Sequence, residues 1–522
     1  MKNNINKLFV LFLVSFIVIS CDEFLDELPD NRTEIDNNTK IRKILVSAYP
    51  TTSFGIIAEI SSDNTDDYGE DNPWFDRFYE QNAYWEDITE TANDGPASLW
   101  SGCYSAIANA NQALAGINEQ GNPESLSAER GEALIARAYS HFVLINMFSM
   151  HYNTQTSDTD LGVPYLETPE TTLDPKYKRG NVKDVYEKIN KDIEEALPLI
   201  RDDIYDVPKY HFNVKAAYAF AARFNLYYEN WEKAKEYASI VVTSNPSSVL
   251  RDWEALGQLP TADKSLAYTV GNASLLTQAT SSNAGYIFGR YYTGARFNHT
   301  NTIANRESLN VALPWASNAR LYPYFRPWTA AVANFQKSLS LKIPDLFEYT
   351  DPVALIGFRK AVRNPFTTDE TLLVRAEANI MLKQYDAALA DLNAFTMNYN
   401  QQPASALPET NLVEVNTFYD AVNYSTEASP TQKKTLTPKF TIESGTQENM
   451  LHYTLQLRRI VTIHEGLRWF DNKRYGMVIP RYKGSNGYTS TIVADVLTAN
   501  DPRKAVQLPQ DVISAGLAPN PR

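Results

Sequence analysis

Two segments of the chain repeat one helix–turn–helix pattern, and this repeat limits what the chain can fold into. Residues 222–234 align without gaps with residues 376–388, at an offset of 154 residues. Asparagine, an aromatic residue, an acidic residue and alanine recur at equivalent positions. Alanine where two helices cross lets them approach closely, and one such pair cannot bury its apolar face alone. The repeat predicts several stacked helical hairpins, unless two amphipathic helices merely resemble each other by chance.

Apolar residues at helical spacing extend the pattern along the chain. The candidate hairpins cover about residues 96–150, 181–244, 367–399 and one pair that includes 447–475. Between them lie three long stretches with little helical periodicity, residues 50–95, 250–365 and 400–446. Loops of such length in a compact protein are usually functional. The predicted fold class is therefore all-α, a tetratricopeptide-like helical-hairpin scaffold with long irregular loop insertions.

Several notable side chains fall on these helices. Trp100, Tyr104 and Asn111 belong to one apolar stripe. The helix around His141 is apolar on both faces, which predicts burial between layers and a hydrogen-bonded core histidine. Cys103 lies in an apolar helical stretch, where we expect a small buried side chain rather than a nucleophile.

The N-terminus has the pattern of an export signal. Lys2 and Lys7 precede an apolar run over residues 8–19, which as a helix spans about 18 Å, against roughly 30 Å for a bilayer core. Ser20 and Cys21 follow directly, a small residue before a lone cysteine that resembles a bacterial lipobox. We expect residues 1–20 to be removed and Cys21 to carry fatty-acyl chains such as palmitate.

Composition excludes other classes of protein. A formal net charge of −14 disfavours nucleic acid as a partner. Two cysteines provide no disulfide framework, and P-loop, nucleophile-elbow and zincin motifs are missing from the sequence. His464-Glu465 begins like a zinc motif, but Arg468 stands in place of the second histidine. We expect no cofactor, with Ca²⁺ at the acidic run 63–71 as an option and a solvated acidic loop as the favoured reading.

Aromatic residues in the long loops are candidates for ligand binding. A flat ring can take the apolar face of a sugar, while amide, carboxylate and guanidinium groups take its hydroxyls. The alternative for each ring is packing inside its own loop. The candidate platforms are Trp74, Trp85, Tyr291, Tyr292 and Trp315.

Several segments, in their order and spacing, resemble one known family across essentially the whole chain. They begin with Cys21-Asp-Glu-Phe-Leu-Asp-Glu-Leu-Pro29 and the block at residues 131–139, and Gly162-Val-Pro164 follows. Near the end come Glu465-Gly466-Leu-Arg468-Trp-Phe-Asp471 and Leu508-Pro-Gln510. This pattern resembles the SusD/RagB family of outer-membrane nutrient-binding lipoproteins. His464 departs from it, because the family usually has an aromatic residue there.

The resemblance implies a surface-exposed lipoprotein on the outer membrane that is not an enzyme. It would capture a nutrient, mostly an oligosaccharide, and pass it to a SusC-like TonB-dependent transporter. A peptide-binding receptor, a surface glycoside hydrolase with a carboxylate pair and a purely structural adaptor are alternatives. The charged residues that carry the motifs are expected to pair within the scaffold: Glu132, Arg137, Glu465, Arg468 and Asp471.

The same resemblance implies a division of the chain. A signal peptide covers residues 1–20, and the lipidated cysteine and its tether cover 21–40. An N-terminal helical region covers 41–250. A loop-rich insertion at 251–365 is the candidate ligand face, and residues 366–522 form the C-terminal region.

Overall fold

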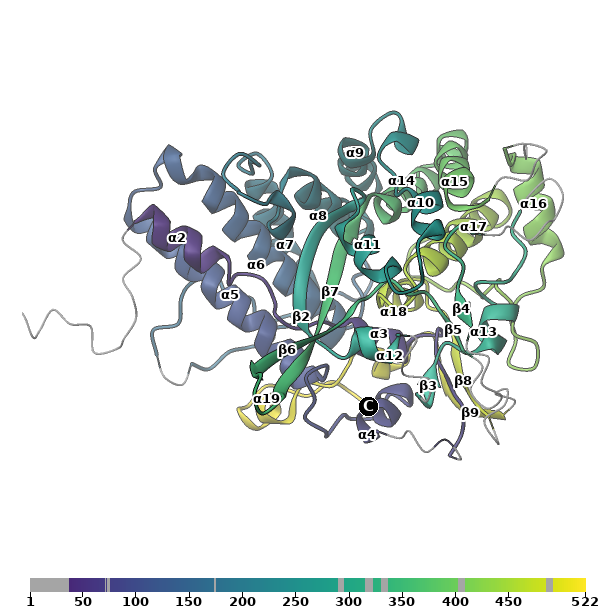
Figure 1. Cartoon of the computed structure of the whole chain (residues 1–522), viewed down its shortest axis with the longest axis horizontal. Helices are drawn as coiled ribbons and strands as arrows, with labels where there is room; N and C mark the ends of the chain where they lie inside the picture. Colours follow the sequence, from purple (N-terminus) through teal and green to yellow (C-terminus); the bar gives the residue numbers. More distant parts are fainter. Residues whose placement is uncertain are drawn as a thin grey trace, which may run out of the picture.

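The computed structural model confirms a scaffold of stacked helices with a few small sheets (Figure 1). It describes residues 37–70, 72, 76–172, 175–289, 295–314, 323–329, 337–401, 409–484 and 492–522. Within these ranges the chain forms 18 α-helices. They run from α2 and α5 at one end of the molecule to α16 and α17 at the other. No helix in the described ranges is both long enough and apolar enough to cross a bilayer.

The first layer contains the longest helices. Its members are α2 (Asn38–Leu45), α5 (Pro96–Glu119), α6 (Ser127–Phe148) and α7 (Val182–Ala196). α6 packs between α5 and α7, and all but two of its 22 residues are buried. The prediction that this helix lies between layers is therefore confirmed.

The repeated segments form two hairpins with the same backbone geometry. They are α8 (Val214–Tyr227) with α9 (Trp231–Val242), and α14 (Thr368–Met381) with α15 (Tyr385–Tyr399). Glu229 and Lys383 occupy equivalent turn positions, and both have φ of +59°. In each turn the next residue donates its backbone N–H to the repeated asparagine, Asn225 at 2.9 Å and Asn379 at 2.8 Å. The repeat is structural, and α14 packs against α9 so that the two hairpins stack.

The C-terminal helices complete the scaffold. α17 (Thr446–Val461) packs against α14 and α16 (Leu412–Ala421), and α18 (Leu467–Arg474) follows it. The shorter helices are α3 (Gly55–Ser61), α4 (Arg77–Ala83), α10 (Trp253–Gln258), α11 (Lys264–Val270), α12 (Ala284–Ile287), α13 (Asn301–Arg306) and α19 (Gln510–Ser514).

The stretch 250–365, which we expected to be irregular, contains an antiparallel sheet. Its strands are β2 (Ser274–Ser281), β7 (Ile356–Thr367) and β6 (Asp345–Asp351), in the order β2-β7-β6. β7 runs directly into α14, so the sheet is continuous with the helical scaffold. The register between β2 and β7 shifts twice, between Ser274 and Gln278. Such bulges interrupt the two-residue alternation that identifies strands in a sequence.

Two further small sheets join distant parts of the chain. One has the order β3-β1-β8-β9, from β3 (Phe297–Asn298), β1 (Asp66–Asp67), β8 (Ile479–Lys483) and β9 (Ile492–Leu497). The other pairs β4 (Trp328–Thr329) with β5 (Ser338–Leu339).

Buried ion pairs connect the C-terminal helices to the rest of the fold, as the motif residues predicted. Arg468 forms a two-bond contact with Asp63, with distances of 2.7 and 2.8 Å. Arg458 likewise binds Asp471, with distances of 2.9 and 2.7 Å, and also contacts Glu377 on α14. Although burial opposes it, the nearby guanidinium groups lower the pKa of Glu377 to about 2. These charges are therefore ionised in the interior.

One buried carboxyl group in this region has no such cation bound to it. The Asp66 side chain is 3% exposed and accepts a hydrogen bond from the Thr300 hydroxyl at 3.2 Å. Burial, and then the negative charge of Glu307, raise the pKa of Asp66 to about 7. Its charged form is therefore unfavourable in the folded state.

Adjacent alanines in the second repeat test the stacking of the hairpins. Ala388 is fully buried on α15, whereas Ala387 is exposed. We expect Ala388→Leu to lower the free energy of unfolding by roughly 1–3 kcal/mol, because the added carbons must displace packed neighbours. Ala387→Leu should change it by less than about 0.5 kcal/mol. Chemical denaturation of both variants measures the difference, and equal effects would contradict close packing at this turn.

Replacing Asp66 tests its raised pKa. A carboxyl with a folded pKa of about 7 and an unfolded pKa near 3.9 stabilises the fold below pH 3.9. That contribution is lost as the pH rises through 7. Asp66→Asn removes this titratable group. From pH 5 to pH 8, the free energy of unfolding of the variant should therefore rise by about 2 kcal/mol relative to that of the wild type. Thermal unfolding at both pH values measures this, and a pH-independent difference would refute the assignment.

Candidate functional site

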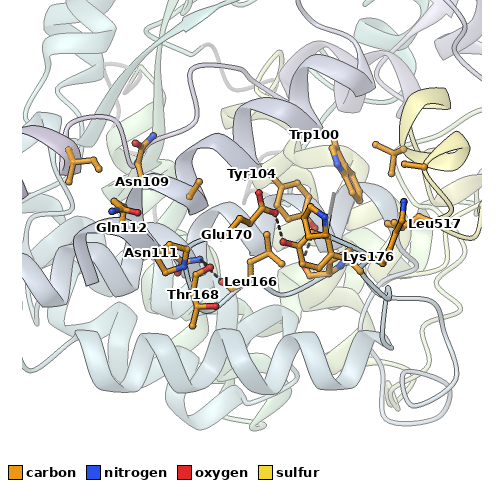
Figure 2. A pocket seen from close by; sticks show the side chains of 18 of the residues that line it. Trp100, Tyr104, Asn109, Asn111, Gln112, Leu166, Thr168, Glu170, Lys176 and Leu517 are labelled. Atoms are coloured by element: carbon orange, nitrogen blue, oxygen red, sulfur yellow. Dashed lines mark hydrogen bonds between the residues drawn. The ribbon is translucent and has the colours of Figure 1, made fainter. Parts of the chain in front are cut away.

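A pocket with a volume of about 1200 Å³ lies in the N-terminal helical layer (Figure 2). It lies between α2, α5, the segment that links α6 to α7, and the residues around α19. Its lining residues are Lys40, Lys43, Ile44, Trp100, Tyr104, Ala108, Asn109, Asn111, Gln112, Pro164, Leu166, Thr168, Pro169, Glu170, Pro175, Lys176, Tyr177, Val512, Ala515, Gly516 and Leu517.

Two rings from α5 form the aromatic wall. Trp100 and Tyr104 are one helical turn apart, with ring centroids 4.9 Å apart and planes inclined by 50°. Both are only half-buried, so part of each ring faces the pocket (Figure 2). Phe148 supports Trp100 edge-on from behind, at 5.1 Å, and the Tyr104 hydroxyl donates to the Pro164 carbonyl at 2.8 Å. These contacts fix the two rings in place before any ligand arrives.

The opposite wall is the segment after α6, held in position by a buried ion pair. Arg137 on α6 binds both carboxylate oxygens of Asp192 on α7, at 2.7 and 2.8 Å. The same guanidinium donates to the Glu167 carbonyl at 3.1 Å and to the Asn111 side chain at 2.9 Å. Asn111 in turn donates to the Leu166 carbonyl at 3.0 Å. A single arginine on α6 therefore ties two walls of the pocket, α5 and the segment after α6, to α7.

His141 supports the same segment as a neutral side chain. Its ring stacks on Tyr165 with centroids 3.8 Å apart, and its Nε2 accepts the Leu166 N–H at 3.1 Å. Its Nδ1 lies 3.0 Å from the Arg137 carbonyl, which can only accept. Burial lowers the pKa of His141 to about 3. The prediction of a hydrogen-bonded core histidine is confirmed, and so is the burial of Cys103.

Charged groups stand at the rim of the pocket. Lys40 and Lys43 come from α2, and Lys176 comes from the opposite side. The Tyr177 hydroxyl donates to Glu170, and burial together with this carboxylate raises the pKa of Tyr177 to about 12. Among the lining residues that the structure describes, Glu170 is the one carboxylate. The arrangement is suited to binding a polar ligand that also has apolar faces.

Four of the predicted platforms, Trp74, Tyr291, Tyr292 and Trp315, lie outside the described residues, as does Cys21. Strand β1 precedes Trp74 in the chain, and strand β3 follows Tyr291 and Tyr292. These two strands pair in antiparallel register, with Asp67 opposite Phe297.

Trp85 is described and differs from an open platform. It is 5% exposed, its indole N–H donates to the Ser61 carbonyl at 2.8 Å, and the Arg481 guanidinium lies 4.9 Å from its ring centroid. It borders a smaller hollow of about 560 Å³. In this conformation Trp85 is a packing residue, the alternative that the sequence left open.

The acidic run 63–71 is largely internal rather than solvated. Asp63, Asp66 and Asp67 are all buried, which contradicts the expectation of a solvated loop at these positions. Asp67 binds Arg296 through both oxygens, at 2.6 and 2.7 Å. In the described ranges no group of three or more His, Cys, Asp or Glu side chains is arranged to hold a metal ion.

Residues 23–226 match a SusD-like family described as starch-binding and associating with the outer membrane. No curated protein matches the sequence. A SusD superfamily protein from Bacteroides vulgatus has 19% identity and a TM-score of 0.63, with 94% of this chain and 99% of that chain covered.

Two further solved structures are similar. A putative sugar binding protein from B. vulgatus has 17% identity and a TM-score of 0.65, with 94% of this chain and 99% of that chain covered. A SusD superfamily protein from Bacteroides thetaiotaomicron has 20% identity and a TM-score of 0.62, with 92% and 98% covered. At these identities the likeness shows a shared fold.

The pocket wall can be tested by removing its central arginine. We expect Arg137→Ala to lower the free energy of unfolding by about 3–5 kcal/mol, because Asp192 would be left buried without its counter-charge. The control is Lys188→Ala, which removes an exposed pair with Glu167 on the same segment and should cost less than about 1 kcal/mol. Denaturation curves measure both, and similar losses would show that the buried pair has no special role.

Proposed function

We propose that this chain, a SusD-like protein by the match of residues 23–226 and by its overall fold, is a binding lipoprotein that captures an oligosaccharide at the outer membrane. The family description and the names of two solved relatives, a putative sugar binding protein and a SusD-like carbohydrate binding protein, support a carbohydrate ligand. The protein binds its ligand and leaves it chemically unchanged.

The observation that carries the proposal is the pocket beside α5. Two pre-positioned rings, Trp100 and Tyr104, line one part of the pocket, and the amide groups of Asn109 and Gln112 line another part further along α5 (Figure 2). Sugars present apolar C–H faces and polar edges, and this pairing of groups serves both. A volume of about 1200 Å³ exceeds the 300–1,000 Å³ that is usual for small-molecule pockets, which favours a ligand of several units.

The proposed anchor is close to this pocket along the chain. Cys21 would be acylated, and α2, which begins at Asn38, provides Lys40 and Lys43 to the pocket rim. The ligand would then pass to a SusC-like TonB-dependent transporter in the same membrane. Trp74, Tyr291, Tyr292 and Trp315 remain proposed as additional ligand contacts.

A peptide ligand is the second candidate. Lys40, Lys43 and Lys176 with Glu170 give the rim both signs of charge, which also suits the termini and side chains of a peptide. The two candidates differ in whether charge or ring stacking controls affinity.

Removing the central ring of the wall tests the proposed function. A glycan panel first identifies an oligosaccharide that the wild-type protein binds. We expect Trp100→Ala to weaken binding of this oligosaccharide by about 1–3 kcal/mol, because the aromatic face on which a sugar ring can stack is lost. The control is Trp231→Ala. Trp231 is a half-buried residue on α9, and its ring centroid lies 5.4 Å from that of Phe440. Titration calorimetry measures both, with melting temperatures to correct for stability.

Other outcomes decide between the alternatives. Loss of binding in Trp315→Ala with full binding in Trp100→Ala would move the site to the loops. Binding of peptides alone would favour the second candidate, and release of shorter sugars would identify a hydrolase.

A further inference from the structure

The ribbon formed by β6 and the start of β7 has the largest concentration of exposed apolar side chains in the described chain. These side chains are Leu346, Phe347, Tyr349, Val353, Leu355 and Ile356, with exposed fractions of 42% to 93%. Every residue of β6 is exposed, on both faces of the strand. Isolated exposed apolar residues are ordinary, but a group of this kind marks a contact surface.

The outer part of this ribbon stands clear of the rest of the fold. β2 pairs with β7 only as far as Lys360, so residues 356–359 pair with β6 alone. At the base, α12 supports the ribbon, where the Arg359 guanidinium lies 3.8 Å from the Tyr286 ring centroid. Figure 1 shows β6 and β7 extending beyond β2 towards the margin of the molecule.

The chemistry of the ribbon differs between its tip and its strands. Residues 352–356, here called the aliphatic tip, are Pro-Val-Ala-Leu-Ile, and Val353 is 93% exposed. Behind the tip, aromatic and charged side chains share the two strands. Phe347 and Tyr349 have ring centroids 4.9 Å apart, and Phe347 lies opposite Arg359, which binds Asp345 at 2.6 Å.

One acidic residue adjoins the tip, and its charge is engaged in the turn. The Asp351 carboxylate accepts the backbone N–H groups of Val353 at 2.9 Å and Ala354 at 3.0 Å. These bonds satisfy donors that would otherwise be exposed at the end of the hairpin. The turn therefore presents its aliphatic side chains outward.

We propose that the aliphatic tip inserts into the interfacial region of the lipid bilayer. Aliphatic groups favour the acyl boundary, whereas aromatic rings and charged groups suit the headgroup level and the water beside it. The ribbon has an aliphatic tip and a mixture of aromatic and charged side chains behind it. A protein partner is less well supported, because a standard interface uses about 20–30 residues a side and the tip provides five.

The proposed lipid anchor provides the proximity that this contact requires, and the inference depends on the proposed function only in this respect. Sixteen residue steps separate Cys21 from Asn37, where the described chain begins. Fully extended, they reach about 55 Å. An anchor on such a tether keeps the whole protein within reach of the membrane, and a second, weak contact would then fix its orientation.

A fluorescent label at the tip tests the contact in the full acylated protein. Val353→Cys can be labelled selectively with an environment-sensitive dye, because Cys103 is buried and Cys21 would be acylated. The control label is at Val413→Cys on α16, where the native side chain is 73% exposed. In phosphatidylcholine vesicles we expect a blue shift and quenching by nitroxide lipids at position 353 and neither at position 413.

A second variant separates membrane contact from other causes. In the unacylated Cys21→Ala chain, Leu355→Asp should reduce co-flotation with the same vesicles and leave oligosaccharide binding unchanged. A label at position 353 that behaves like the one at 413 would overturn the proposal. So would shielding that appears without vesicles as protein concentration rises, since it would show self-association. Failure of glycan binding with quenching intact would instead refute only the proposed function.

Discussion

Buried ion pairs and hydrogen bonds hold this fold together where α3 and the segment after it meet α17, α18 and the turn between them. Asp63 binds Arg468, and the Glu59 carboxylate accepts the backbone N–H groups of His464 at 2.8 Å and Gly466 at 3.1 Å. These residues are about 400 positions apart in the chain. Each ionised group would be costly to bury alone, so the pairs permit one arrangement of the two segments and penalise others. The stacked hairpins form most of the scaffold, and these contacts join its N-terminal and C-terminal parts.

The helical part of the fold could be predicted because its signals are local. The turns at Glu229 and Lys383 share a backbone geometry that follows from the repeated asparagine and alanine positions. The strands were missed because their signal is weak locally. β7 has Arg359 and Lys360 among its apolar residues, and bulges break its pairing with β2. His464, which departs from the family pattern, stacks on Phe288 at 4.5 Å with planes 10° apart, so it packs as the expected aromatic residue would.

The pocket could not be predicted, for a related reason. Trp100 and Tyr104 have the same spacing as residues that face a core, and sequence periodicity does not distinguish a covered face from a partly covered one. What leaves them half-open is the path of the segment between α6 and α7, which depends on Arg137 and Asp192. The aromatic residues of the long loops have polar neighbours in sequence and no helical periodicity, which predicted exposed rings. Trp85 is nevertheless buried, with contacts to Ser61 and Arg481.

The position of α2 has a thermodynamic consequence. This helix is the first element that the structure describes, it is buried through Ile41 and Leu45, and its Ile44 lines the pocket. A ligand that contacts α2 in the pocket would favour the state in which this helix is packed on α5. Linkage is reciprocal, so a change that stabilises the packed state of α2 must favour ligand binding by the same factor. Ligand affinity and the local stability of α2 would then be coupled quantities.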